Sequence, residues 1–164
     1  MAHSQHDEPM RFGIHRLSDN DYEDAARLVR KSFTHYVAPD WSMEASESFC
    51  AAVSAAMLQT GDEAHRYCIG WFDAGVMTGV LIMPKPTWLR MLFVDPVKAR
   101  QGIGSRLWNH ACVHLGTHHP DIREVTLYAS PYAYPFYQAL GFVSRGEESC
   151  DDGMRATPMA YQMA

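Results

Sequence analysis

The stretch MLFVDPVKARQGIGSRL, residues 91–107, decides the fold class. An apolar run that ends at Val94 is followed by Asp-Pro, by a loop with Gly102 and Gly104, and by apolar residues that begin at Ile103 and recur at every fourth position. This order predicts a central β-strand, a glycine-containing turn and a helix. Because a helix N-terminus presents unpaired N–H groups and a partial positive charge, it binds phosphate oxygens without help from side chains. The stretch therefore predicts an α/β protein with an anion site where the helix begins.

The residues around this turn favour an anionic ligand. Gly102 and Gly104 let the backbone approach a ligand closely, where a β-carbon would collide with it. Lys98 and Arg100 add positive charge at the rim, and residues 96–120 contain no Asp or Glu. The positive charge is local, because the whole chain has a net charge of −5.

Two common phosphate motifs do not fit the turn. A Walker loop needs Gly-Lys-Ser/Thr, which the sequence lacks. A dinucleotide fingerprint needs a third glycine where Leu107 stands, and it belongs on the first strand of its unit. Here three strands and two helices are expected before the strand that leads into the turn. A nucleotide-binding oxidoreductase is therefore only the weaker alternative.

The rest of the chain predicts a mixed α/β domain. Hydrophobic periodicity and turn residues indicate the order strand, two helices, three strands, helix, strand, helix, two strands. We expect a central mixed sheet of about six or seven strands with helices on both faces, a flexible tail at residues 1–9 and one domain at residues 10–164. The expected strands are 11–17, 67–72, 76–83, 88–94, 125–129, 142–143 and 154–161, with an acidic loop at 147–152. The expected helices are 18–33, 42–61, 103–116 and 134–140.

Length and composition exclude several classes of protein. A chain of 164 residues with 47% apolar and 20% charged residues has room for one core. It contains no run of about 20 uncharged apolar residues, so no membrane partner is expected. The polar first ten residues do not form a signal peptide, and the four cysteines form no CxxC pair, which favours free thiols in the cytoplasm. The acidic balance argues against a nucleic-acid partner.

A second stretch, ASPYAYPFYQALGF at residues 129–142, is the other motif that bears on the family of the protein, beside residues 91–107. Together, and in this order, the two stretches resemble the GNAT acyltransferase superfamily, and the order of elements resembles it over residues 11–163. The resemblance implies a GNAT-like α/β fold and an N-acetyltransferase. Such an enzyme moves an acetyl group from acetyl-CoA to an amine by direct transfer.

The resemblance also implies roles for individual residues. Tyr137 matches the position of the general acid that protonates the departing thiolate. The strand end at Phe93 and Val94 would pair with the pantetheine arm, and a backbone N–H there would bind the thioester oxygen. Ala99 stands where the family usually has Arg or Gln, so Arg100 or Gln101 takes over that contact. The remaining cofactor-binding residues implied are Gly102, Ile103, Gly104, Ser105 and Ser130.

Several assignments stay open at this point. The alternative to a catalytic role for Tyr137 is ordinary packing in the core, since Phe136, Leu140 and Phe142 surround it in sequence. The other tyrosines that could serve as the general acid are Tyr128, Tyr132 and Tyr134. The candidates for the general base are His35, Glu44, Glu47 and His65.

The histidines of the long helix raise the question of a metal site. His110 and His114 have the i, i+4 spacing of a metal pair, but a solvated helix face explains them better, so no metal is expected. The acceptor is a small-molecule or peptide amine, and the acidic balance favours a cationic one. Exposed final strands favour a homodimer. A non-catalytic CoA-binding sensor or regulatory module remains the alternative from another functional class.

Overall fold

The computed structural model describes residues 9–164, so most of the tail expected at residues 1–9 lies outside the described residues. The helices are α1 (Tyr22–Tyr36), α2 (Met43–Ala52), α3 (Ala55–Leu58), α4 (Ile103–His118) and α5 (Tyr134–Leu140). The strands are β1 (Gly13–Arg16), β2 (Tyr67–Asp73), β3 (Val76–Met83), β4 (Met91–Val94), β5 (Glu124–Ala129), β6 (Val143–Ser144), β7 (Ser149–Asp151) and β8 (Met154–Gln162).

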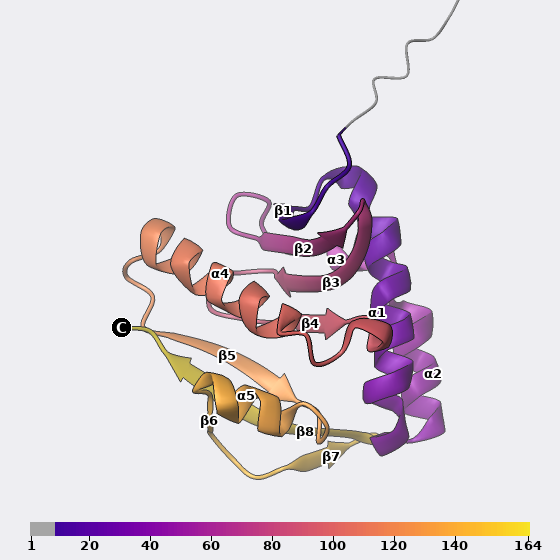
Figure 1. Cartoon of the computed structure of the whole chain (residues 1–164). Helices are drawn as coiled ribbons and strands as arrows, with labels where there is room; N and C mark the ends of the chain where they lie inside the picture. Colours follow the sequence, from indigo (N-terminus) through magenta and orange to yellow (C-terminus); the bar gives the residue numbers. More distant parts are fainter. Residues whose placement is uncertain (1–8) are drawn as a thin grey trace, which may run out of the picture.

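The strands form two sheets, which Figure 1 shows one above the other. The first has the order β1-β2-β3-β4, and the second has the order β5-β8-β6 with β7 also paired to β8; every pairing within them is antiparallel. The mixed α/β fold class is thus confirmed, but the sheet expected to be continuous is divided.

The two sheets meet in parallel at one bridge between Trp88 and Thr126. Beyond it, no pairing joins β4 to β5. At the end of β4, the Val94 carbonyl accepts a hydrogen bond from Ser32 Oγ of α1 (3.2 Å), and Lys31 pairs with Asp95 (2.9 Å). We call the space between the diverging strands the β4–β5 split.

Helices cover both faces of the first sheet, and each face has its own core. Leu107 and Ala111 of α4 pack in the same buried cluster as Ile69 and Leu81. On the other face, α1 packs in a cluster built around Val29, Val80 and Ile82. The second sheet is covered by α5, which lies beside α4 in front of the sheets (Figure 1).

Two local expectations were wrong. The helix expected over residues 42–61 begins as predicted, with Ser42 Oγ accepting from Ala45 N (3.1 Å), but it breaks into α2 and α3. The break occurs because Val53 and Ser54 are extended, and Ser54 Oγ accepts from Met57 N to start α3.

The acidic loop expected at residues 147–152 contains strand β7. Asp152 and Gly153 have φ values of 51° and 81°, and this turn folds β7 back onto β8. The Asp-Gly pair was a hairpin signal that the sequence prediction missed.

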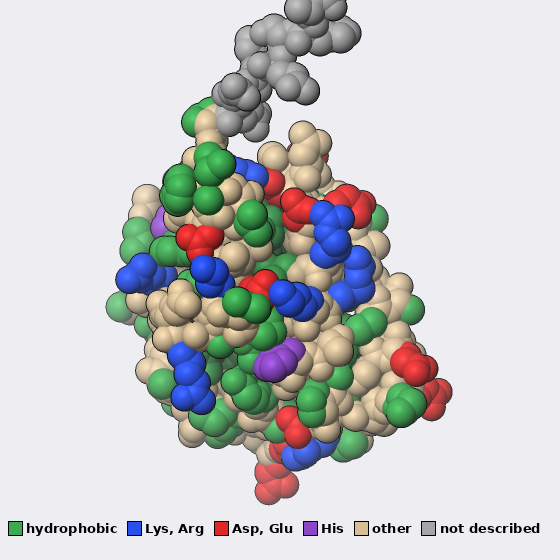
Figure 2. All heavy atoms as spheres, turned by 45° about the vertical axis from the view of Figure 1, so that its right-hand side comes forward, with side chains coloured by type: hydrophobic (Ala, Val, Ile, Leu, Met, Phe, Trp, Pro, Cys, Tyr) green, Lys and Arg blue, Asp and Glu red, His purple; other side chains and the backbone are tan. Residues whose placement is uncertain are grey.

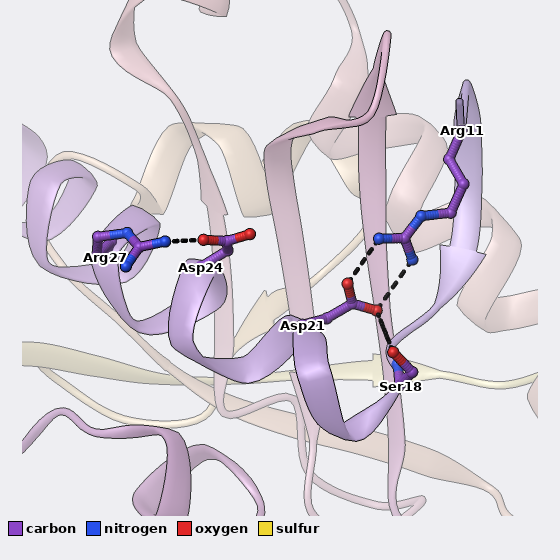
Figure 3. Close-up of polar contacts among 5 residues, drawn as sticks. All are labelled: Arg11, Ser18, Asp21, Asp24 and Arg27. Atoms are coloured by element: carbon purple, nitrogen blue, oxygen red, sulfur yellow. Dashed lines mark hydrogen bonds and ion pairs between the residues drawn. The ribbon is translucent and has the colours of Figure 1, made fainter. Parts of the chain in front are cut away.

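The start of α1 is fixed by a buried carboxylate (Figure 3). Asp21 is 5% exposed and accepts hydrogen bonds from Ser18 N (2.8 Å) and from both terminal nitrogens of Arg11 (3.0 and 2.6 Å). Ser18 and Asp21 thus form a capping box, with Arg11 as an additional partner of the carboxylate. Within residues 9–164, no helix combines the length and the apolar character needed to cross a bilayer.

Candidate active site

The glycine turn places three unpaired amides at the start of α4. Gly102 is the N-cap residue with φ 79°, a conformation that glycine adopts without strain. The helix bond from Arg106 N to Gly102 O (3.1 Å) comes only one turn later. The N–H groups of Ile103, Gly104 and Ser105 precede it and have no acceptor among the described residues. The turn therefore has the donors that an anion needs.

The surroundings of the turn fit a phosphate-bearing group. A β-carbon on Gly102 would meet nothing within 4 Å, so open space adjoins the N-cap. A β-carbon on Gly104 would lie 3.0 Å from Phe136 and 3.8 Å from Val94, so this glycine lets α4 approach α5 and β4 closely. The backbone is thus open at residue 102 and tightly packed at residue 104.

The charged rim differs from the expectation in one respect. Lys98 forms an ion pair with Asp73 of β2 (3.2 Å), so its charge is partly neutralised. Arg100 is exposed, has φ 64° and forms no ion pair with any residue in the described part of the chain. Gln101 is also exposed and Ser105 is half-buried. Of the two cations expected at the rim, Arg100 is the one left for a ligand.

The end of β4 turns one amide towards the split. Asp95 N donates to Thr78 O of β3 (2.8 Å), and successive residues of a strand direct their N–H groups to opposite edges. The N–H of Val94 therefore points away from β3, towards the β4–β5 split. The side chain of Val94 packs against the α4 cluster, whereas that of Phe93 packs against the α1 cluster. The two residues expected to act together face opposite sides of the sheet.

Tyr137 combines a buried ring with a hydroxyl that has no hydrogen-bond partner among the described residues. Its side chain is 7% exposed and makes edge contacts with Phe136 and Phe142, with ring centroids 5.3 and 5.4 Å away. Burial raises the pKa of Tyr137 well above its ordinary value, which keeps the hydroxyl protonated. Such a group can donate a proton.

The neighbouring polar candidates have other surroundings. Tyr128 is 74% exposed on the uncovered face of β5, and Tyr134 accepts a hydrogen bond from Gln138 (3.4 Å). Ser130 Oγ accepts from Ala133 N (3.3 Å), so it stabilises the turn before α5. Tyr132 lies against Tyr36 of α1 with ring centroids 4.9 Å apart. None of the three alternative tyrosines shares the buried position of Tyr137.

The four candidates for the general base lie in different parts of the structure. His65 is hydrogen-bonded to Asp62 (2.5 Å), and its ring lies 6.3 Å from that of His119, near the end of α4 opposite the glycine turn. Glu44 and Glu47 are exposed on α2. His35 makes an edge contact with Tyr36 (4.8 Å).

The histidines of α4 contact one tyrosine. His110 Nδ1 is 2.8 Å from Tyr67 Oη, and the ring of His114 stacks on Tyr67 at 3.8 Å. Across residues 9–164, no three His, Cys, Asp or Glu side chains are placed to hold a metal ion together.

The start of α4, the end of β4 and Tyr137 of α5 lie on one side of the first sheet, because Ile103, Val94 and Tyr137 pack in the same core cluster. The family model of the acetyltransferase (GNAT) domain matches residues 37–163. The chain belongs to this family, so the resemblance drawn from residues 91–107 and 129–142 is confirmed.

Solved structures share the fold at low sequence identity. A GCN5-related N-acetyltransferase from Rhodopseudomonas palustris superposes with a TM-score of 0.77 at 21% identity, over 93% of this chain and 97% of that one. The PaiA N-acetyltransferase of Thermoplasma acidophilum, in complex with coenzyme A, gives 0.74 at 22% identity, over 93% and 99%. The ribosomal-protein-S18-alanine N-acetyltransferase of Escherichia coli gives 0.64 at 20% identity, over 92% and 93%. Comparison with curated protein sequences gave no match.

Proposed function

We propose that this protein is an N-acetyltransferase that moves an acetyl group from acetyl-CoA to an amine acceptor by direct transfer, with residues 10–164 as the transferase domain. The observation that carries the proposal is the set of unpaired amides at Ile103, Gly104 and Ser105 beside the β4–β5 split. Acetyl-CoA supplies a reactive thioester joined to a diphosphate, and the turn offers donors for the diphosphate.

Each residue of the site has a definite task in this proposal. The amides of Gly102, Ile103, Gly104 and Ser105 bind the diphosphate, and the side chains of Arg100 and Gln101 supply the contact that Ala99 lacks. The strand end at Phe93 and Val94 pairs with the amide groups of the pantetheine arm. The Val94 N–H binds the thioester oxygen, where negative charge develops. Ser130 supports the turn that leads into α5.

Tyr137 protonates the leaving sulfur in this proposal. Its hydroxyl has no competing partner among the described residues and is protonated at neutral pH, so its proton is available to the thiolate. The buried ring is held by Phe136 and Phe142, which fixes the direction of the hydroxyl. We propose no metal for the reaction.

The acceptor belongs to the class of small-molecule or peptide amines. Structures that share the fold include an aminoglycoside 6'-N-acetyltransferase and the ribosomal-protein-S18-alanine N-acetyltransferase, so the fold serves both kinds of amine. For this chain we propose a cytoplasmic reaction with no nucleic acid or membrane partner, and a homodimer formed through the final strands.

Thermal denaturation tests the donor half of the proposal. Acetyl-CoA at about one hundred times its Kd should raise the Tm by about 5–10 °C, whereas NADH should leave it unchanged. Gly102→Val places a branched side chain in the open space beside the N-cap and should abolish the acetyl-CoA shift. A Tm raised by NADH and not by acetyl-CoA would support the oxidoreductase instead.

Thiol release separates the enzyme from the sensor. The acceptor panel contains an aminoglycoside, a peptide that begins with alanine and a simple polyamine. An enzyme releases CoA thiol with at least one amine, and mass spectrometry finds the acetylated amine. Binding of acetyl-CoA without amine-dependent thiol release across the panel would favour the regulatory module.

A further inference from the structure

Two tyrosines from distant parts of the sequence meet at the open end of the β4–β5 split. Tyr36 is the last residue of α1, and Tyr132 lies between β5 and α5. Their ring centroids are 4.9 Å apart and the rings are inclined by 33°. Tyr132 is 57% exposed, so the core does not require its ring.

The backbone fixes this pair at the ends of both strands. Ser32 Oγ holds the Val94 carbonyl at 3.2 Å, and Tyr36 lies one helical turn further along the same face of α1. Tyr132 follows Ala129, the last residue of β5, by three positions. The tyrosine pair therefore connects the ends of β4 and β5 where no backbone pairing joins them.

The pair joins the two sides of the split. Val94 and the start of α4 belong to one core cluster, whereas Phe93 and α1 belong to the other. Tyr132 directly precedes Ala133, which packs in the α4 cluster, whereas Tyr36 ends α1. A carrier bound at the start of α4 reaches the split from the α4 side, so we infer that the second reactant enters from the α1 side and meets the pair where the two sides join.

The surface beside the pair is acidic. The segments 37–52 and 146–155 are joined by hydrogen bonds from Ser42 N to Gly153 O (2.9 Å) and from Trp41 Nε1 to Arg155 O (3.1 Å). Their only cation is Arg155, which pairs with Glu148 (3.2 Å) and Asp40 (3.7 Å). Figure 2, which brings α1 and α2 forward, shows acidic side chains at the lower and right-hand edges of this face and Lys and Arg side chains across its middle. The acidic residues of the two segments are Asp40, Glu44, Glu47, Glu147, Glu148, Asp151 and Asp152.

We propose that Tyr36 and Tyr132 form the acceptor-binding pair of the transferase and that its acceptor is an amine with several positive charges. This inference rests on the proposed function. An ammonium group binds favourably over the face of a tyrosine ring, so the pair holds the acceptor next to the end of β4. The acidic segments raise the local concentration of a polycation and steer it to the pair.

Steady-state kinetics with two amines test this proposal in the full-length protein. Spermine serves as the polycation and propylamine as the single-charge comparison, and both are followed by thiol release. Tyr132→Ala should raise the KM for spermine about fivefold or more, with the KM for acetyl-CoA unchanged. Tyr132→Phe keeps the ring and should stay within about twofold of the original protein.

Tyr128→Ala is the matched control, because Tyr128 is an exposed tyrosine of the adjacent strand on the uncovered face of the sheet. It should change neither KM. Added salt should lower kcat/KM for spermine more than for propylamine, since screening weakens long-range attraction.

The outcomes separate the two proposals. Absence of an acetyl-CoA thermal shift in the original protein overturns the proposed function and this inference with it. Binding of acetyl-CoA with faster turnover of propylamine than of spermine overturns the polycationic acceptor alone. Equal KM values for Tyr132→Ala and Tyr128→Ala overturn the role of the tyrosine pair and leave the transferase intact.

Discussion

Gly79 of β3 lies directly against Ile103, the first residue of α4. A β-carbon on residue 79 would come within 2.7 Å of Ile103 Cγ2 and 3.2 Å of Leu107 Cδ1. Both of those side chains are buried, so neither can move aside at low cost. The missing side chain at residue 79 thus sets how closely the N-terminal end of α4 approaches the sheet.

Gly79→Ala should therefore displace the start of α4. We expect a loss of about 1–3 kcal/mol of unfolding free energy from overpacking and a weaker acetyl-CoA thermal shift. Urea denaturation with and without acetyl-CoA measures both effects. Gly116→Ala is the control on the same helix, where a β-carbon meets nothing within 4 Å, and it should stabilise the protein by up to about 1 kcal/mol. Equal stability of the two variants would contradict this account.

Tyr137→Phe should separate chemistry from binding. The hydroxyl has no partner to lose among the described residues, so the Tm should change by no more than about 2 °C. Turnover should fall about 100-fold or more, because the proton donor is gone, while the KM for acetyl-CoA stays the same. Thiol release at saturating amine gives kcat. Unchanged kcat would assign Tyr137 to packing alone.

His114 should make the fold sensitive to mild acid. Burial, helped by His118, Arg16, His119 and His110, lowers the pKa of His114 from 6.5 to about 4. The unfolded chain therefore binds the proton first, and stability falls as the pH drops from 6.5 towards 4.

A pH series of melting curves checks the prediction for His114. Because His114 is only partly buried and its interactions are screened, we expect His114→Gln to reduce the drop in Tm between pH 7 and pH 4.5 by only about 2–4 °C. His35→Gln, which replaces an exposed histidine, should show the same drop in Tm between pH 7 and pH 4.5 as the original protein. A steeper fall for His114→Gln than for the original protein would contradict the direction of the pKa shift.

Asp21→Asn should loosen the start of α1. Hydrogen bonds from Arg11 lower the pKa of Asp21, so its contribution to stability is present above about pH 4 and is lost as the pH falls below that value. We expect the variant to lose about 1–3 kcal/mol at pH 7 and to show a smaller further loss at pH 3. Figure 3 also shows the control, Asp24, whose ion pair with Arg27 is exposed on both sides. Asp24→Asn should cost less than about 0.5 kcal/mol in the same urea titrations.

Local patterns predicted the elements of the fold well. Pro135 occupies the first turn of α5 because the helix begins at Tyr134, as the tolerance of proline at that position predicts. Asp73-Ala74-Gly75 forms the turn between β2 and β3, with positive φ at Ala74 and Gly75. These features depend on neighbouring residues, and their signals lie within a few positions of each other.

Contacts between distant segments could not be predicted in the same way. Lys98 was expected at the anion, but Asp73 lies close enough to pair with it only after β2 and β4 have joined the same sheet. The hydrogen bond at the end of β4 joins Val94 to Ser32, which is 62 residues away in sequence. Tyr36 was not singled out at all, because nothing in its own helix indicates the contact with Tyr132.

The arrangement of β4 and β5 also limits aggregation through unpaired strand edges. Exposed strand edges recruit other chains into intermolecular sheets and lead to aggregation. Here the second edges of β4 and β5, strands of 4 and 6 residues, are held beside each other by the Trp88–Thr126 bridge, so neither offers a long template to a neighbouring molecule.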